Sequence, residues 1–236
     1  MKTPVSEVMP WPLPAVLIAL GSCLAIACPS PTTHQSGADP PGHYLIYLHG
    51  RIVQEQGPRA ISERFGPYQF EAIVVALRRA GAEVVAPLRS PGSNLHQSAA
   101  EVTERVGALM AQGIAADRIT LVGASQGSVI AMLASQELAL DQLGLVLMGA
   151  CNGWVTGELQ PDLHGRVLSL YEPGDRHGGS CRELVEQSSG VTAFEEIRLD
   201  TRLDHGFLYR PLEEWVDPAT DWALKGVRER GRELSG

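Results

Sequence analysis

A buried strand, a tight turn and a helix are predicted in direct succession by RITLVGASQGSVIAMLASQELA, residues 118–139. The first seven residues form an apolar run of strand length, and the apolar pattern that follows has helical spacing. Gly123 and Gly127 flank Ser125 and leave room for a sharp bend between the two elements. The junction therefore predicts a serine that projects above the edge of a sheet at the start of a helix. The alternative is a glycine-rich turn without chemistry.

The rest of the chain repeats this alternation of apolar strand-length runs with longer helical segments. Strands are expected at 43–49, 82–88, 118–124, 143–150, 166–172 and 192–200, and helices at 66–81, 94–113, 125–139, 181–188 and 211–233. Such alternation indicates parallel strands joined by crossover helices. The predicted class is α/β, with one doubly wound, mainly parallel sheet of about six strands over residues 43–236 and no cap domain. Residues 50–68 remain an unassigned loop that should overhang the site.

Composition excludes several classes of function. The chain has 236 residues, of which 44% are hydrophobic and 19% charged, as in an ordinary globular protein. Its net charge is -8 at pH 7, and Lys and Arg do not cluster, so we expect no nucleic-acid partner. The sequence has no phosphate-binding glycine motif, no H-E-x-x-H and no paired-cysteine motif. We therefore expect neither an organic cofactor nor a metal ion.

The first 42 residues predict export. Residues 1–28 contain an apolar run that ends in small residues, which is typical of a signal peptide. Cys23 and Cys28 each follow small residues and resemble the lipidated cysteine of bacterial lipoproteins, so either is a candidate for lipidation. Residues 29–42 are rich in Pro, Ser, Thr and Gly and predict a flexible tether. We expect a protein of the bacterial cell envelope or periplasm that meets the membrane through this anchor; cleavage with release, or a spanning helix, is the alternative.

Two cysteines remain in the folded part, Cys151 and Cys181. In an exported protein an even pair of cysteines predicts a disulfide, and two thiols are too few for a zinc cluster. Two buried free thiols are the alternative. Because these cysteines follow adjacent predicted strands, a bond between them would tie together two loops at the carboxyl edge of the sheet.

A serine nucleophile needs a base and an acid to orient that base, and the sequence offers both at the same sheet edge. His205 follows the last predicted strand and is the expected base, with His177 as its rival. Asp175 follows the preceding strand in a Pro/Gly turn and is the expected acid, and Glu172 is the alternative. Ser125, Asp175 and His205 then stand in the chain order of nucleophile, acid and base that is found in α/β hydrolases.

An acyl-transfer site also needs hydrogen-bond donors for the oxyanion. The backbone amide of Gln126, directly after the serine, is the first candidate. The second is an amide in the loop after the first strand, from Arg51 or, next, Ile52. His49 and Gly50 precede Arg51 and are expected to support this turn; a simple strand-ending turn is the alternative.

Four motifs in this order, YLHG (residues 47–50), GASQG (123–127), YEPGD (171–175) and LDHGF (203–207), resemble the α/β-hydrolase superfamily. Within it the chain is similar to the small, capless serine esterases of the dienelactone hydrolase or carboxylesterase kind. The resemblance implies a serine hydrolase that cleaves a small-molecule carboxylic ester or thioester through an acyl-enzyme. A non-catalytic envelope binding protein on the same fold and an acyltransferase with the same residues are the alternatives.

Overall fold

A computed structural model describes residues 42–233 and, for residues 225–233, the backbone alone. The expected signal segment (1–28) lies outside the described residues, and so does the expected tether (29–42) apart from Gly42. Across residues 42–233, no helix has the length and apolar character that crossing a membrane would need.

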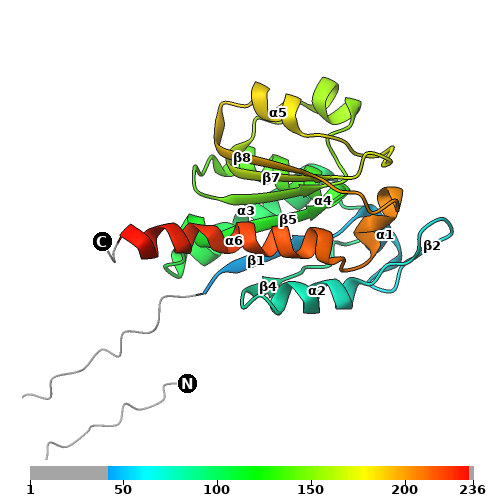
Figure 1. The fold of residues 1–236 in the computed structure, drawn as a ribbon, viewed down its shortest axis with the longest axis horizontal. Helices are drawn as coiled ribbons and strands as arrows, with labels where there is room; N and C mark the ends of the chain where they lie inside the picture. The colour runs from blue at the N-terminus through cyan, green and yellow to red at the C-terminus, as the bar shows by residue number, and fades with distance from the viewer. Residues whose placement is uncertain (1–41, 234–236) are drawn as a thin grey trace, which may run out of the picture. The chain divides into compact units, whose positions relative to one another are not determined.

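The core of the fold is a six-stranded parallel sheet in the order β4-β1-β5-β6-β7-β8. Figure 1 labels β4, β1, β5, β7 and β8 in this order across the sheet. The expectation of about six parallel strands is therefore confirmed. Its strands are β1 (Tyr44–Leu48), β4 (Glu83–Val85), β5 (Ile119–Ala124), β6 (Gly144–Met148), β7 (His164–Tyr171) and β8 (Gly190–Arg198).

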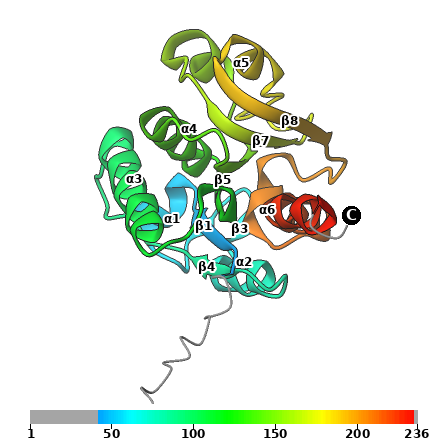
Figure 2. The same cartoon turned by 90° about the vertical axis from the view of Figure 1, so that its left-hand side faces the viewer.

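Helices cover both faces of this sheet, since the central strands bury side chains on each side. On one face, Leu45, Val122 and Val146 pack with apolar side chains of α2 (Phe70–Arg78) and α6 (Glu213–Glu233). On the other face, Ile46, Leu121 and their neighbours pack with α3 (Leu95–Ala111) and α4 (Gln126–Leu138). Figure 2 shows the two helix layers on opposite sides of the strands. The strands therefore read as continuous apolar runs because both faces are buried.

The segment after β1 differs from the expected loop. It forms a short helix α1 (Arg51–Gln56) and a small antiparallel hairpin of β2 (Ile61–Ser62) and β3 (Gly66–Pro67). The hairpin takes up the first residues of the helix expected at 66–81, so α2 begins only at Phe70. Elements this short carry too few residues to show a hydrophobic period.

Smaller elements complete the chain. They are α5 (Arg182–Gln187), the 3-10 helices η1 (Ala116–Arg118) and η3 (Asp204–Tyr209), and the π-helix η2 (Val155–Leu159). The connection between β6 and β7, where a cap would be inserted, contains η2. All six strands run in the same direction, so the loops after β1, β5, β6, β7 and β8 meet at one edge of the sheet.

Candidate active site

Ser125 lies at a strained turn between β5 and α4. Its φ of 55° and ψ of -119° fall in a region that residues with a side chain rarely adopt. The neighbouring glycines make this bend possible: a Cβ on Gly123 would lie 2.4 Å from Ser128 Cα, and one on Gly127 would lie 1.8 Å from the Leu48 carbonyl oxygen. The turn holds the Ser125 hydroxyl at the carboxyl edge of the sheet, at the N-terminus of α4.

His205 joins Ser125 to Asp175. Its Nε2 lies 3.0 Å from Ser125 Oγ, and its Nδ1 lies 2.7 Å from Asp175 Oδ2. Because an ionised carboxylate can only accept, Nδ1 carries the proton and Nε2 is left to accept from the Ser125 hydroxyl. The structure thus brings together three residues that are separated by up to 80 positions in the sequence.

Asp175 is buried and is held in place by its own loop. Its Oδ1 accepts a hydrogen bond from the His177 backbone N–H at 2.8 Å, which leaves Oδ2 for His205. Glu172, the alternative acid, has a different partner. Its Oε2 accepts from the backbone N–H of Thr201 at 2.7 Å and from the Thr201 hydroxyl at 2.6 Å. Glu172 therefore anchors the segment after β8, and Asp175 orients the histidine.

His177, the rival base, lies beside His205. The two imidazole rings are 5.0 Å apart between centroids, in an edge-to-face arrangement. His205, and not His177, accepts the hydrogen bond of the Ser125 hydroxyl, so His177 is placed in the wall of the cavity.

The residues expected to supply oxyanion donors lie on either side of Ser125. Gln126 is the first residue of α4 and Arg51 the first residue of α1, so neither amide N–H has an acceptor within its helix. Both residues line the cavity that contains Ser125, as does Ile52. Gly50 completes the arrangement, since a Cβ on it would lie 3.7 Å from Ser125 Cβ. The backbone after β1 therefore passes directly beside Ser125.

Ser125 and His205 open to a cavity of about 830 Å³. Its apolar lining includes Ile52, Phe65, Leu95, Val129, Ala150, Val155 and Leu208. Residues 50–68 form one wall, as expected from their place after the first strand, and the loop after β6 forms another. Phe65 of the hairpin packs against the ring of His205 at 6.2 Å between centroids. The cavity is large enough for a small organic ligand.

The sequence matches no family model and no curated protein. Solved structures do resemble the chain. A sugar hydrolase from Lactococcus lactis aligns with a TM-score of 0.55 at 15% identity, covering 81% of this chain and 92% of its own. A truncated carbohydrate esterase from gut microbiota aligns with a TM-score of 0.55 at 11% identity, covering 81% and 88%. SOBER1 from Arabidopsis thaliana aligns with a TM-score of 0.53 at 10% identity, covering 78% and 99%.

The chain has the α/β-hydrolase fold. At this level of identity the likeness establishes the architecture, and the chemistry has to be argued from the site. In this fold Ser125 lies at the strand-to-helix turn between β5 and α4, and Asp175 and His205 come from later loops at the same sheet edge.

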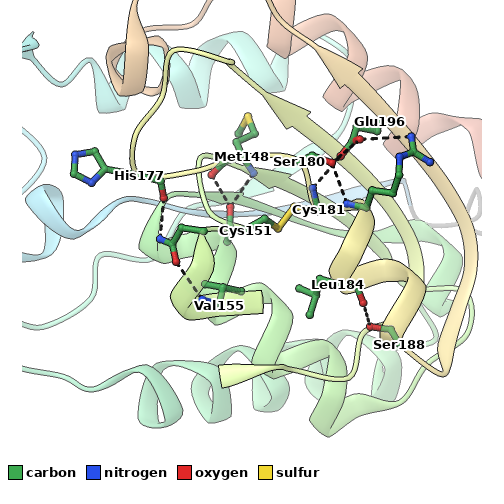
Figure 3. The surroundings of a disulfide bond; sticks show 12 residues. Met148, Cys151, Val155, His177, Ser180, Cys181, Leu184, Ser188 and Glu196 are labelled. Carbon is green, nitrogen blue, oxygen red and sulfur yellow. Dashed lines mark hydrogen bonds and ion pairs between the residues drawn. A yellow bond between two sulfur atoms is a disulfide. The ribbon is translucent and has the colours of Figure 1, made fainter. Parts of the chain in front are cut away.

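The expected disulfide between Cys151 and Cys181 is present, with the two Cα atoms 5.1 Å apart (Figure 3). It joins the loop after β6 to the segment before α5. Beside it, Asn152 Nδ2 donates a hydrogen bond to the His177 carbonyl oxygen at 2.9 Å. The disulfide and this hydrogen bond together tie the Asp175 loop to the loop after β6, which forms one wall of the cavity.

His49 has a structural place at the end of β1. It is fully buried, its Nδ1–H donates to the Gly50 carbonyl oxygen at 2.9 Å, and its Nε2 accepts from the Arg89 backbone N–H at 3.2 Å. Burial, reinforced by the nearby Arg89 guanidinium, lowers the pKa of His49 from 6.5 to about 4. The imidazole is therefore neutral at physiological pH and pins the turn before Arg51.

Two polar residues near the site, Arg89 and Gln54, were not predicted from the sequence. Both are buried, and the Arg89 guanidinium reaches the turn after β1 and the side chain of Gln126. The sequence feature that could have indicated Arg89 is its place shortly after a strand whose carboxyl end lies at the same sheet edge as Ser125. It was missed because that strand is the three-residue β4, and the following turn reads as ordinary loop.

The described residues hold no group of three or more His, Cys, Asp or Glu side chains that is placed to bind a metal ion.

Proposed function

We propose that this protein is a serine hydrolase that cleaves a carboxylic ester or thioester through an acyl-enzyme. The observation that carries the proposal is the hydrogen-bond chain from Ser125 Oγ through His205 to Asp175, on a strained turn that opens to a cavity. The solved structures that resemble the chain include a sugar hydrolase and a carbohydrate esterase, which supports a general hydrolase or esterase function.

Acylation begins when Ser125 Oγ attacks the carbonyl carbon of the substrate. The hydroxyl proton passes to His205 Nε2, and the Asp175 carboxylate stabilises the imidazolium through Nδ1–H. The negative charge moves to the former carbonyl oxygen, where the Gln126 and Arg51 amides donate to it. The tetrahedral intermediate then collapses, and His205 returns the proton to the departing alcohol or thiol.

Deacylation repeats these steps with water. His205 Nε2 takes a proton from a water molecule as the water oxygen attacks the acyl carbon. The same two amides stabilise the second oxyanion. Collapse of this intermediate breaks the bond to Ser125 Oγ, which recovers its proton from His205, and the carboxylic acid leaves.

The cavity favours an ester with a hydrocarbon acyl chain over an anionic one. Both arginines that line it are paired, since Arg51 Nε lies 2.6 Å from Glu55 and Arg64 Nη2 lies 2.6 Å from Asp204. An anionic substrate would have to compete with Glu55 and Asp204 for these arginines, whereas the apolar lining stabilises a hydrocarbon acyl chain by removing it from water.

A fluorophosphonate probe tests the nucleophile without knowledge of the substrate. We expect the wild-type protein to be labelled at Ser125 and the Ser125→Ala variant to remain unlabelled. Ser189→Ala is the matched control, since Ser189 is exposed and binds Asp162 far from the cavity. Equal labelling of wild type and Ser125→Ala would overturn the proposal. A panel of nitrophenyl esters of increasing acyl length then defines the substrate class.

We also propose that the protein is exported and lipid-anchored through Cys28 or Cys23. The disulfide supports export, because such bonds persist in oxidising compartments. Fractionation of bacterial cells should recover the protein with membranes, and Cys23→Ser with Cys28→Ser should release it. Recovery of the wild type in the cytoplasm with Cys151 and Cys181 reduced would contradict this proposal.

A further inference from the structure

Arg89 is a buried arginine whose hydrogen bonds reach both sides of the nucleophile. It lies in the loop after β4, outside the lining of the cavity, and it takes no part in the steps proposed above. Its Nη2 lies 2.7 Å from the His49 carbonyl oxygen, 3.4 Å from the Gly50 carbonyl oxygen and 3.2 Å from Gln126 Oε1. One nitrogen therefore contacts the turn after β1 and the first residue of α4.

The contact with Gly50 bears directly on the Arg51 amide. The Gly50 carbonyl and the Arg51 N–H belong to one planar trans peptide, so they point in opposite directions. A hydrogen bond that fixes the carbonyl therefore fixes the N–H. The His49 ring donates to the same carbonyl oxygen at 2.9 Å, and Arg89 adds a longer contact, because the two N–H groups of its Nη2 are shared among three acceptors. A hydrogen bond accepted by the carbonyl also polarises the peptide and makes its N–H a stronger donor.

The contact with Gln126 bears on the second amide. The Gln126 side chain accepts a hydrogen bond from Arg89 Nη2. Gln126 therefore cannot turn its side chain toward the substrate without losing this bond. The Arg89 Nε–H donates to Gln54 Oε1 at 3.1 Å, and Gln54 in turn donates to the Ser93 carbonyl oxygen at 2.9 Å. This second layer holds the guanidinium plane in one orientation.

We propose that Arg89 is the positioning residue of the oxyanion hole, which sets the Arg51 and Gln126 amides at the distance that the oxyanion requires. The inference rests on the proposed hydrolase function. The rigid fork of the guanidinium suits this role, because it directs Nε and Nη2 to acceptors on two different segments at once. A lysine ammonium carries its three N–H donors on one atom at the end of a flexible stem, so it cannot reach acceptors that Arg89 contacts from two separate nitrogens.

The test uses the full chain with the variants Arg89→Met and Arg89→Lys. Arg166→Met is the matched control, because Arg166 also donates to backbone carbonyls, of Gln142 and Asp117, but lies near the opposite end of the sheet. Each protein is assayed for its melting temperature, for kcat and KM on 4-nitrophenyl acetate, and for its rate of fluorophosphonate labelling.

We expect Arg89→Met to lower kcat and the labelling rate by about 10²-fold, the effect of losing one oxyanion donor, with KM changed by less than about threefold. Arg89→Lys should fall between wild type and Arg89→Met, and Arg166→Met should keep kcat even where its melting temperature falls. A folded Arg89→Met with wild-type kcat would overturn the proposal, and so would a loss expressed in KM alone. If Arg89→Met fails to fold, Arg89→Lys decides: an unchanged kcat overturns the proposal.

The same experiment separates this proposal from the proposed function. Wild-type labelling that Ser125→Ala abolishes supports the hydrolase. If Arg89→Met is then labelled as fast as wild type, the positioning role fails while the hydrolase stands. If the wild type is not labelled at Ser125, both proposals fail together.

Discussion

Asn152 Nδ2 donates a hydrogen bond to the carbonyl oxygen of His177, and it thereby joins the loop after β6 to the loop that carries Asp175. The bond lies one residue from Cys151, whose disulfide to Cys181 closes the same pair of loops. The His177 backbone N–H in turn donates to Asp175. The orientation of the Asp175 carboxylate therefore depends on covalent and hydrogen-bonded links outside the loop itself.

Removal of this disulfide should lower both stability and activity. The bond closes a loop with a sequence separation of 30, for which chain entropy predicts a loss of about 3.5 kcal/mol in the free energy of unfolding. We expect this loss in urea denaturation of the Cys151→Ala, Cys181→Ala double variant, with a lower kcat because Asp175 is less firmly held. Asn152→Asp serves as a comparison that removes one donor and keeps the disulfide. Unchanged denaturation of the double variant would contradict the prediction.

The two candidate acids, Asp175 and Glu172, should respond differently to neutralisation. Asp175→Asn exchanges the acceptor of the His205 Nδ1–H and should lower kcat by about 10⁴-fold with little change in fold. Glu172→Gln weakens the bonds to Thr201 and should cost about 1–3 kcal/mol of stability while kcat changes by less than about tenfold. Steady-state kinetics and thermal melting of both variants check this. The reverse ranking in kcat would identify Glu172 as the acid.

The glycines of the chain offer a matched pair for the turn at Ser125. Gly127→Ala would place a Cβ 1.8 Å from the Leu48 carbonyl oxygen, so α4 must move away from β1, at a cost of about 3 kcal/mol and with loss of activity. Gly107→Ala in α3 meets no described atom within 4 Å and should raise stability by about 1 kcal/mol. Urea denaturation gives both values. A stable, active Gly127→Ala variant would contradict this prediction, because it would show that the turn can accommodate a methyl group.

His49 should make stability depend on pH. The pKa of His49 is about 4 in the folded state and near 6.5 in the unfolded state. Between pH 4 and pH 6.5, His49 is therefore protonated in the unfolded chain and neutral in the folded one. The contribution is fully present above pH 6.5 and is lost as the pH falls toward 4, a change of about 3 kcal/mol. We expect His49→Asn to show a smaller loss of unfolding free energy between pH 7 and pH 4 than wild type. Parallel losses in the two proteins would refute this assignment.

Much of the architecture could be read from short segments. Apolar runs of strand length alternate with helical periods, and that pattern is local, so the six parallel strands were predictable with errors of a few residues at their ends. The turn at Ser125 was equally predictable, because the two positions that have no room for a Cβ, Gly123 and Gly127, lie within five residues of sequence. The segment at 50–68 was not, since α1 and the β2–β3 hairpin are too short to carry a period.

The choice between chemically similar groups came from contacts across long separations. The Pro/Gly turn after the strand favours Asp175 over Glu172 in the sequence, but their partners are set only when the segment after β8 places Thr201 on Glu172 and His205 on Asp175. In the same way, Arg89 reads as a loop residue until folding brings it to Gly50 and Gln126. Periodicity and glycine sterics are properties of neighbours in the chain and are visible in the sequence. Hydrogen-bond partners 30 to 80 residues apart depend on how loops meet at the sheet edge, and that is a property of the folded molecule.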